Sequence, residues 1–182
     1  MVATPACDRA YEDAASPDHT LVCNAKKGLR TSRHDQQVHA WRQVLQRAGC
    51  SSCRAPTHQT IAARAAAGLR QGDIFAAMPD GRLLALGVVG VHPWASSYAA
   101  GTSKSNGKAA RDADVWKRTE FTTNGESAGA FKVVPIAMEM GGRLGATALR
   151  LQSELGDVAA VSNSCVAKAT FRRRALAVLA CS

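Results

Sequence analysis

The sequence GDIFAAMPDGRLLALGVVGVHP spans residues 72–93 and contains two apolar runs joined by a turn. Residues 73–78 have the length and composition of a strand. Residues 79–82 read Pro-Asp-Gly-Arg, in which proline fixes one backbone dihedral and glycine relaxes another, as a tight turn requires. Residues 83–91 carry no charged side chain and predict a second, buried strand. The whole stretch therefore predicts a β-hairpin at the centre of a sheet.

Upstream of this hairpin the pattern is helical. Apolar side chains recur at the spacing of one helix face, at Val38, Trp41, Val44 and Leu45. Gly49 follows, where a helix C-terminus commonly has glycine. Residues 1–30 are rich in small and polar residues and are predicted to be irregular. Residues 50–69 are predicted to form a loop and then a short Ala-rich helix.

Downstream of the hairpin the pattern predicts helix 108–121, strand 131–140, helix 144–155 and helix 158–179. Val115 and Trp116 are predicted core residues of the first of these helices. Pro135 interrupts the strand and cannot donate a ladder hydrogen bond, so this strand is predicted to lie at an edge or to contain a bulge. The order of helices and strands predicts a mixed α/β domain.

Composition limits the class of protein. The chain has 182 residues, of which 46% are hydrophobic and 20% charged, so one packed domain is expected and wholesale disorder is not. The longest nearly apolar run, residues 83–91, is far shorter than the roughly 20 residues that a spanning helix needs. The first twenty residues carry four acids and no apolar h-region. We therefore expect neither a membrane protein nor a secreted one, and a nuclear or cytoplasmic location.

The net charge of +9 is unevenly distributed. Residues 24–70 contain nine Lys and Arg against a single acid, Asp35. Basic blocks suit phosphate contacts, because each contact releases condensed counterions. DNA is therefore the expected partner, and its contacts are predicted at Arg30, Arg33, Arg42 and Arg118. A solvated surface on an arginine-rich protein is the other interpretation.

The chain has six cysteines. Without a secretory signal, thiols or metal ligands are expected in place of disulfides. Cys50 and Cys53 with His58 form one candidate metal cluster. A lone Cys-x-x-Cys is a weak signal, so two ordinary thiols beside a helix end are the favoured interpretation.

Several short motifs follow one another in a recognisable order: Arg33-His34-Asp35, Asp73-Ile74, the Pro-Asp-Gly-Arg turn, Val91-His92-Pro93, Lys117-Arg118, VPIAME at 134–139 and GRLG at 142–145. The series resembles the restriction-endonuclease-like domain at the C-terminal end of some non-LTR retrotransposon polyproteins. The resemblance covers roughly residues 30–155. It implies a mixed central sheet flanked by helices, as in the PD-(D/E)xK nucleases.

Nucleases of this type hold Mg²⁺, a hard cation that prefers oxygen ligands, with two carboxylates at adjacent strand positions. The metal orients water and, with a Lys or Arg, stabilises the charge that develops on the phosphate. The resemblance assigns the first carboxylate to Asp73 and the basic group to Lys117. The position of the second carboxylate is Gly87, so a degenerate copy with impaired nicking is expected. Glu139, at the end of the third strand, is the candidate substitute carboxylate.

The family often carries a zinc knuckle before this domain, with Cys-x-x-Cys followed by His-x(3,4)-Cys. Cys7, His19 and Cys23 match three of the ligands, and Ala10 stands at the fourth position. A structural zinc site is closed by four ligands, so weakened zinc binding is expected unless His34 completes the set. Three unrelated surface residues are the other interpretation.

These observations predict a possible zinc knuckle at 1–30, an endonuclease-like domain at 31–156 and a basic C-terminal helix at 157–182. The favoured function is that of a retroelement-derived DNA-binding domain, which would depend on Mg²⁺ if it retains any nicking. A small basic nucleic-acid-binding protein with a zinc knuckle and no catalysis is the alternative. A translated remnant without a selected function is a third.

Overall fold

The structure is a computed structural model that describes residues 27–54, 72–93, 95, 98, 101, 104–123, 131–162 and 168–180. Three predictions fall outside the described residues. They are the zinc ligands Cys7, His19 and Cys23, the candidate metal ligand His58, and the Ala-rich helix. The described elements are, in chain order, α3 (Lys27–Arg47), β1 (Ser51–Arg54), β2 (Ile74–Ala77), β3 (Leu83–Val91), α6 (Lys108–Thr123), β4 (Phe131–Glu139), α7 (Ala146–Ser162) and α8 (Lys168–Ala180).

The four strands form one mixed sheet in the order β1-β2-β3-β4. β1 and β2 are antiparallel, β2 and β3 are antiparallel, and β3 and β4 are parallel. The predicted hairpin is confirmed: Met78 N–H donates to the Arg82 carbonyl over 2.8 Å, and Gly81 takes a left-handed φ of 86° in the turn. β4 is an edge strand, so the position predicted for Pro135 is also confirmed.

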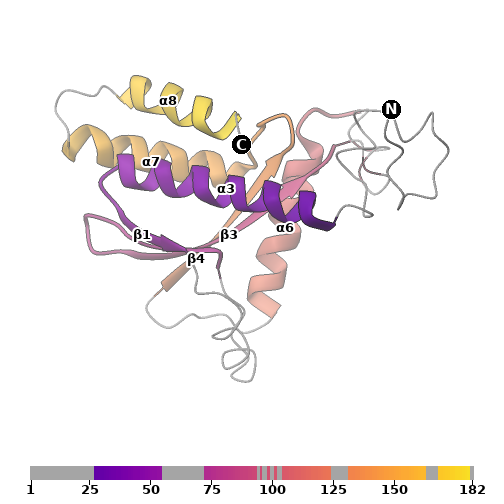
Figure 1. Cartoon of the computed structure of the whole chain (residues 1–182), viewed down its shortest axis with the longest axis horizontal. Helices are drawn as coiled ribbons and strands as arrows, with labels where there is room; N and C mark the ends of the chain where they lie inside the picture. Colours follow the sequence, from indigo (N-terminus) through magenta and orange to yellow (C-terminus); the bar gives the residue numbers. More distant parts are fainter. Residues whose placement is uncertain are drawn as a thin grey trace.

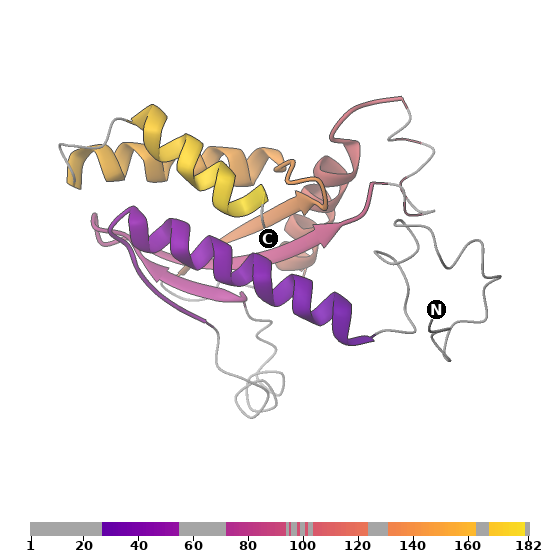
Figure 2. The same cartoon turned by 45° about the horizontal axis from the view of Figure 1, so that its top comes forward.

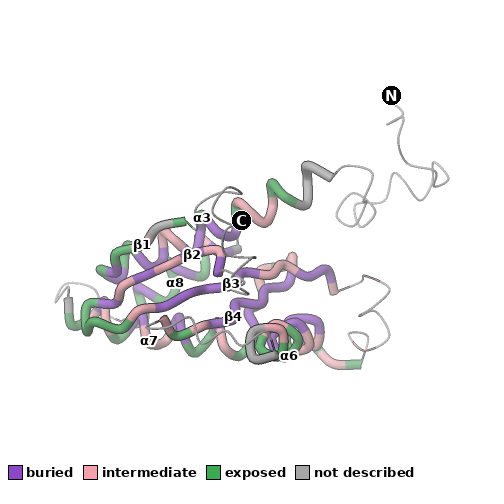
Figure 3. The backbone as a smooth tube through the Cα atoms, turned by 90° about the horizontal axis from the view of Figure 1, so that it is seen from below, coloured by how far each residue is buried: buried purple, intermediate pink, exposed green. Residues whose placement is uncertain are grey.

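Helices cover both faces of the sheet. Figures 1 and 2 show α3, α7 and α8 together on one face and α6 on the other. The larger hydrophobic core lies between the sheet and the three helices, and Trp41, Val44 and Leu45 are fully buried in it. In Figure 3 the buried residues follow the strands through the middle of the molecule. The mixed α/β class with flanking helices is therefore confirmed.

A smaller apolar cluster lies under α6. It joins Val91 of β3 and Ala137 of β4 to Ala109 and Ala113 of α6. Because these helix residues are alanines, α6 packs closely on the sheet through its small side chains. Val115 and Trp116 consequently lie on the outer side, 62% and 54% exposed, and their predicted place in the core is wrong.

Three element boundaries also differ from prediction. α3 begins at Lys27, inside the segment predicted to be irregular. β1 forms where a loop was predicted. Its sequence SSCR has no apolar pattern that would predict a strand, and the strand is stabilised by pairing with β2. The predicted single helix 158–179 is wrong, since α7 ends at Ser162 and α8 begins at Lys168.

A close contact holds α8 against α7. A Cβ atom on Gly156 of α7 would lie only 3.2 Å from Cγ of Lys168 in α8. Glycine at this position therefore lets α8 fold back against α7, and α8 buries Phe171, Ala175 and Leu179 in the core.

The two tryptophans of the described helices provide a matched test of this packing. Trp41→Ala should lower the free energy of unfolding by about 3–5 kcal/mol, because it removes a fully buried side chain from the core. Trp116→Ala, at an exposed position, should cost less than about 1 kcal/mol. Urea denaturation monitored by circular dichroism measures both. Equal losses in the two variants would contradict the described burial.

Candidate functional site

Asp73 lies directly before β2, where β3 continues beyond the end of its partner. Its N–H donates to the Leu86 carbonyl over 2.6 Å, and its Oδ2 accepts the N–H of Val88, also over 2.6 Å. The side chain thus satisfies a backbone donor of β3 that a longer β2 would have paired. This bond fixes the carboxylate of Asp73 beside the position of Gly87.

Gly72 is what allows Asp73 this approach. A Cβ atom on Gly72 would lie 2.8 Å from the Leu86 carbonyl oxygen and 3.0 Å from the Ala85 carbonyl carbon, both backbone atoms of β3. No side chain fits at that distance, and the ring of a proline would clash in the same way.

Alternation along β3 places Gly87 on the face that α6 covers. Leu86 and Val88, its two neighbours, point into the core beneath α3, α7 and α8. Successive side chains of a strand point to opposite faces, so position 87 points toward the α6 side. A side chain at Gly87 would therefore point toward the α6 side, whereas the carboxylate of Asp73, at the end of the adjacent strand, contacts His34 of α3.

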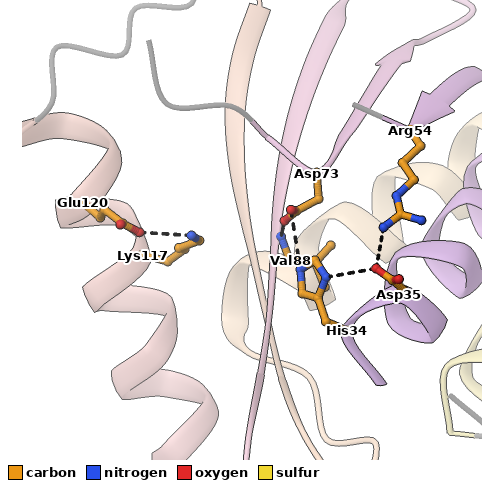
Figure 4. A network of polar contacts seen from close by, with 7 residues as sticks. All are labelled: His34, Asp35, Arg54, Asp73, Val88, Lys117 and Glu120. Atoms are coloured by element: carbon orange, nitrogen blue, oxygen red, sulfur yellow. Dashed lines mark hydrogen bonds and ion pairs between the residues drawn. The ribbon is translucent and has the colours of Figure 1, made fainter. Parts of the chain in front are cut away.

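His34 of α3 lies between two carboxylates. Its Nε2 is 3.5 Å from Oδ1 of Asp73 and its Nδ1 is 3.7 Å from Oδ1 of Asp35, which is also ion-paired to Arg54 (Figure 4). The hydrogen bond to Asp73 raises the pKa of His34 above its ordinary value of 6.5, against the opposing effect of burial. The imidazolium form of His34 is thus favoured beside Asp73.

Lys117 and Glu120 approach the same region from α6. Their side chains form an ion pair of 3.0 Å and are 20% and 16% exposed. In Figure 4, Lys117 points from α6 toward the strands and Asp73. The contact of His34 with Asp73 and the pairing of Glu120 with Lys117 were not predicted. The i, i+3 spacing of Lys117 and Glu120 is a sequence signal for their pairing, whereas no sequence signal links His34 to Asp73.

Glu139 lies elsewhere. It pairs with Val91 in the β3–β4 register, four residues beyond the Pro135–Gly87 pair, which at about 3.3 Å per residue is roughly 13 Å along the strand. Its buried carboxylate accepts the N–H of Ala110 in the first turn of α6 over 3.3 Å. The structure therefore gives Glu139 the role of a helix N-terminal acceptor and does not bring it to Asp73.

The predicted DNA contacts are distributed over both faces of the sheet. Arg33 and Arg42 lie in α3, and both are half-buried. Arg118 lies in α6, where its guanidinium contacts Thr147 Oγ1 at 2.9 Å and Asp114 at 3.4 Å. The side chain of Arg30 is outside the described part. Arg33 and Arg42 therefore lie on the opposite side of the sheet from Arg118.

The donor set around Asp73 does not fit Mg²⁺. One carboxylate is present, its oxygens face the Val88 N–H and the His34 ring, and Gly87 supplies no ligand. A magnesium ion prefers several oxygen ligands, and a single carboxylate supplies too few of them. Within the described ranges no group of three or more His, Cys, Asp or Glu side chains is placed to hold a metal ion.

Cys50 is a core thiol. It is buried, and its Sγ lies 3.4 Å from Sδ of Met78. Burial raises its pKa to about 11, so the thiol stays protonated at neutral pH. Of the candidate cluster with Cys53 and His58, the structure describes only the side chain of Cys50, and it packs in the core against Met78.

Comparisons of the chain with family models, curated proteins and solved structures found no match. None of the helices within the described ranges has the length and apolar character that crossing a bilayer requires.

The pKa of His34 predicts how stability depends on pH. Because the folded-state pKa is raised, the contact stabilises the protein fully below about pH 6.5 and is lost as the pH rises through the folded value. Urea unfolding of the parent protein and of His34→Gln should therefore differ most near pH 5.5 and least near pH 8.5. A difference that grows with pH would contradict the raised pKa.

Proposed function

We propose that this chain is a restriction-endonuclease-like DNA-binding domain of retroelement origin whose metal-dependent nicking is impaired. The observation that carries the proposal is the pairing of Asp73 with β3. The carboxylate of Asp73 bonds to the residue next to Gly87, so the two positions that the resemblance assigns to metal carboxylates are neighbours on adjacent strands. The first position has its carboxylate and the second has no side chain.

The remaining groups suit phosphate binding better than hydrolysis. Lys117 approaches from α6, while His34 and Arg54 surround the acidic side chains on the α3 side (Figure 4). Without a second metal carboxylate nothing on these strands completes a site that would orient an attacking water. The net charge of +9 supports a polyanionic partner, for which this region supplies part of the contact. Such a domain would act in the nucleus or cytoplasm.

Binding to duplex DNA should be strongly salt-dependent. With about four to six phosphate contacts, the slope of log K against log salt concentration should be roughly −4 to −5. Fluorescence anisotropy of a labelled duplex of random sequence, titrated at several salt concentrations, measures this slope. Affinity that is unchanged between low and moderate salt would reject DNA binding through phosphates.

Restoring the second carboxylate should restore nicking. In Mg²⁺ or Mn²⁺ the parent protein should leave supercoiled plasmid intact, and Gly87→Asp should nick it, because a second carboxylate would then stand on β3 next to Val88, whose N–H Asp73 binds. The nicking should disappear in Gly87→Asp with Asp73→Ala. Gly87→Asn is the matched control, since it adds a side chain of the same size without the charge.

Circular dichroism and thermal unfolding must show that each variant is folded, because glycine in a buried strand can mark close packing. A folded Gly87→Asp protein that binds metal and does not nick would overturn the assignment of these two positions. Equal nicking by the Gly87→Asp and Gly87→Asn variants would do the same. The rescue also separates the proposal from the alternative of a small zinc-knuckle protein without catalytic ancestry, for which no rescue is expected.

A further inference from the structure

The C-terminal helix presents an uncompensated basic surface. α8 contains one lysine and three consecutive arginines and no acidic residue. Lys168 is ion-paired to Asp157 of α7, whereas Arg172, Arg173 and Arg174 are exposed. Among the described residues, no carboxylate pairs with these three arginines. The surface of α8 therefore carries positive charge that the fold does not neutralise.

One of these arginines lines a pocket with a second helix. The pocket lies between α3 and α8, has a volume of about 450 Å³, and is lined by Val44, Arg47, Phe171, Arg174 and Ala175. Val44, Phe171 and Ala175 are buried and form an apolar wall, while Arg47 and Arg174 are exposed at its side. Arg47, in the last turn of α3, likewise has no acidic partner among the described residues.

Two guanidinium groups that share a pocket without a carboxylate repel one another, and an anion between them removes that repulsion. The planar donors of arginine match the oxygens of a phosphate, and the aliphatic stems can pack on the apolar wall. We propose that the α3–α8 pocket binds a phosphate of the DNA backbone between Arg47 and Arg174, with Arg173 on the phosphates beside it. The inference rests on the proposed function and gives the same DNA partner a second contact surface.

The proposed phosphate contact in this pocket lies far from the candidate site at Asp73. Arg47 lies thirteen residues after His34 in α3, which at about 1.5 Å per residue is roughly 20 Å along the helix axis. The pocket is lined by residues of α3 and α8, which cover one face of the sheet, whereas Lys117 belongs to α6 on the other face (Figures 1 and 2). DNA held there would be bound independently of the chemistry at Asp73.

Nucleic acid fits this surface better than an anionic membrane does. A helix that lies in a membrane interface exposes an apolar face to the lipid. Phe171 and Leu179 of α8 are buried in the core, and Leu176, 44% exposed, is the one large apolar side chain of α8 that is described as exposed. Positive charge without an apolar face is typical of phosphate-backbone binding.

The test compares two double variants that remove the same charge. Arg47→Gln with Arg174→Gln empties the pocket of its donors, while Lys132→Gln with Arg150→Gln removes two exposed cations that do not line it. Duplex binding is measured by fluorescence anisotropy over a salt series. The pocket variant should bind at least about tenfold more weakly at low salt and lose about 0.9 from the salt slope, the contribution of the one phosphate that the two arginines share. The control should change affinity less than threefold.

Arg47→Lys with Arg174→Lys keeps the charge and should retain most of the slope, and thermal unfolding checks that all variants are folded. A parent protein that does not bind DNA rejects the proposed function itself. A parent that binds DNA, with the two glutamine variants equal, rejects the pocket alone. Loss of binding to phosphatidylserine vesicles with unchanged DNA binding would overturn the inference in favour of a membrane surface.

Discussion

The hydrogen bonds between Asp73 and β3 determine how the centre of the molecule is built. The N–H of Asp73 reaches the Leu86 carbonyl and its carboxylate takes the Val88 N–H, so the chain entering β2 is fixed to the middle of the sheet. The same carboxylate faces His34, which connects the sheet to α3. A single side chain thus satisfies a buried backbone donor and contacts the helix that covers the larger core. Gly72 is part of this arrangement, because a side chain there would clash with the backbone of β3.

This constraint also bears on function. The carboxylate of Asp73 accepts a strand N–H and lies beside His34, and the neighbouring position on β3 is glycine, so one carboxylate stands at this point of the two strands. The structural role of Asp73 therefore does not need the metal that the resemblance implies. In the function proposed above, such a domain keeps its fold and its positive charge without a second metal ligand.

Charge is arranged differently on the two sides of the sheet. In α6 the cations are paired within the helix or with its neighbours, as in Lys117 with Glu120 and Arg118 with Asp114. These pairs favour fixed positions for the side chains around the candidate site. In α8 the three arginines have no acid on their own helix, so their charge remains available to a partner. The two surfaces therefore suit different tasks, one for positioning groups and the other for attracting a polyanion.

The sequence by itself determined the features that depend on neighbouring residues. Turn chemistry at 79–82 predicts the hairpin, helical spacing predicts the burial of Trp41, and the missing N–H of Pro135 predicts an edge strand. Only the tertiary structure decided which positions meet across the chain. β1 is a strand because β2 pairs with it, and Trp116 is exposed because the alanines of α6 pack more closely on the sheet. The contacts of His34 with Asp73, and the shared pocket of Arg47 and Arg174, join helices and strands that are distant in sequence. Local patterns carry no information about such distances, because the packing of complete elements sets them.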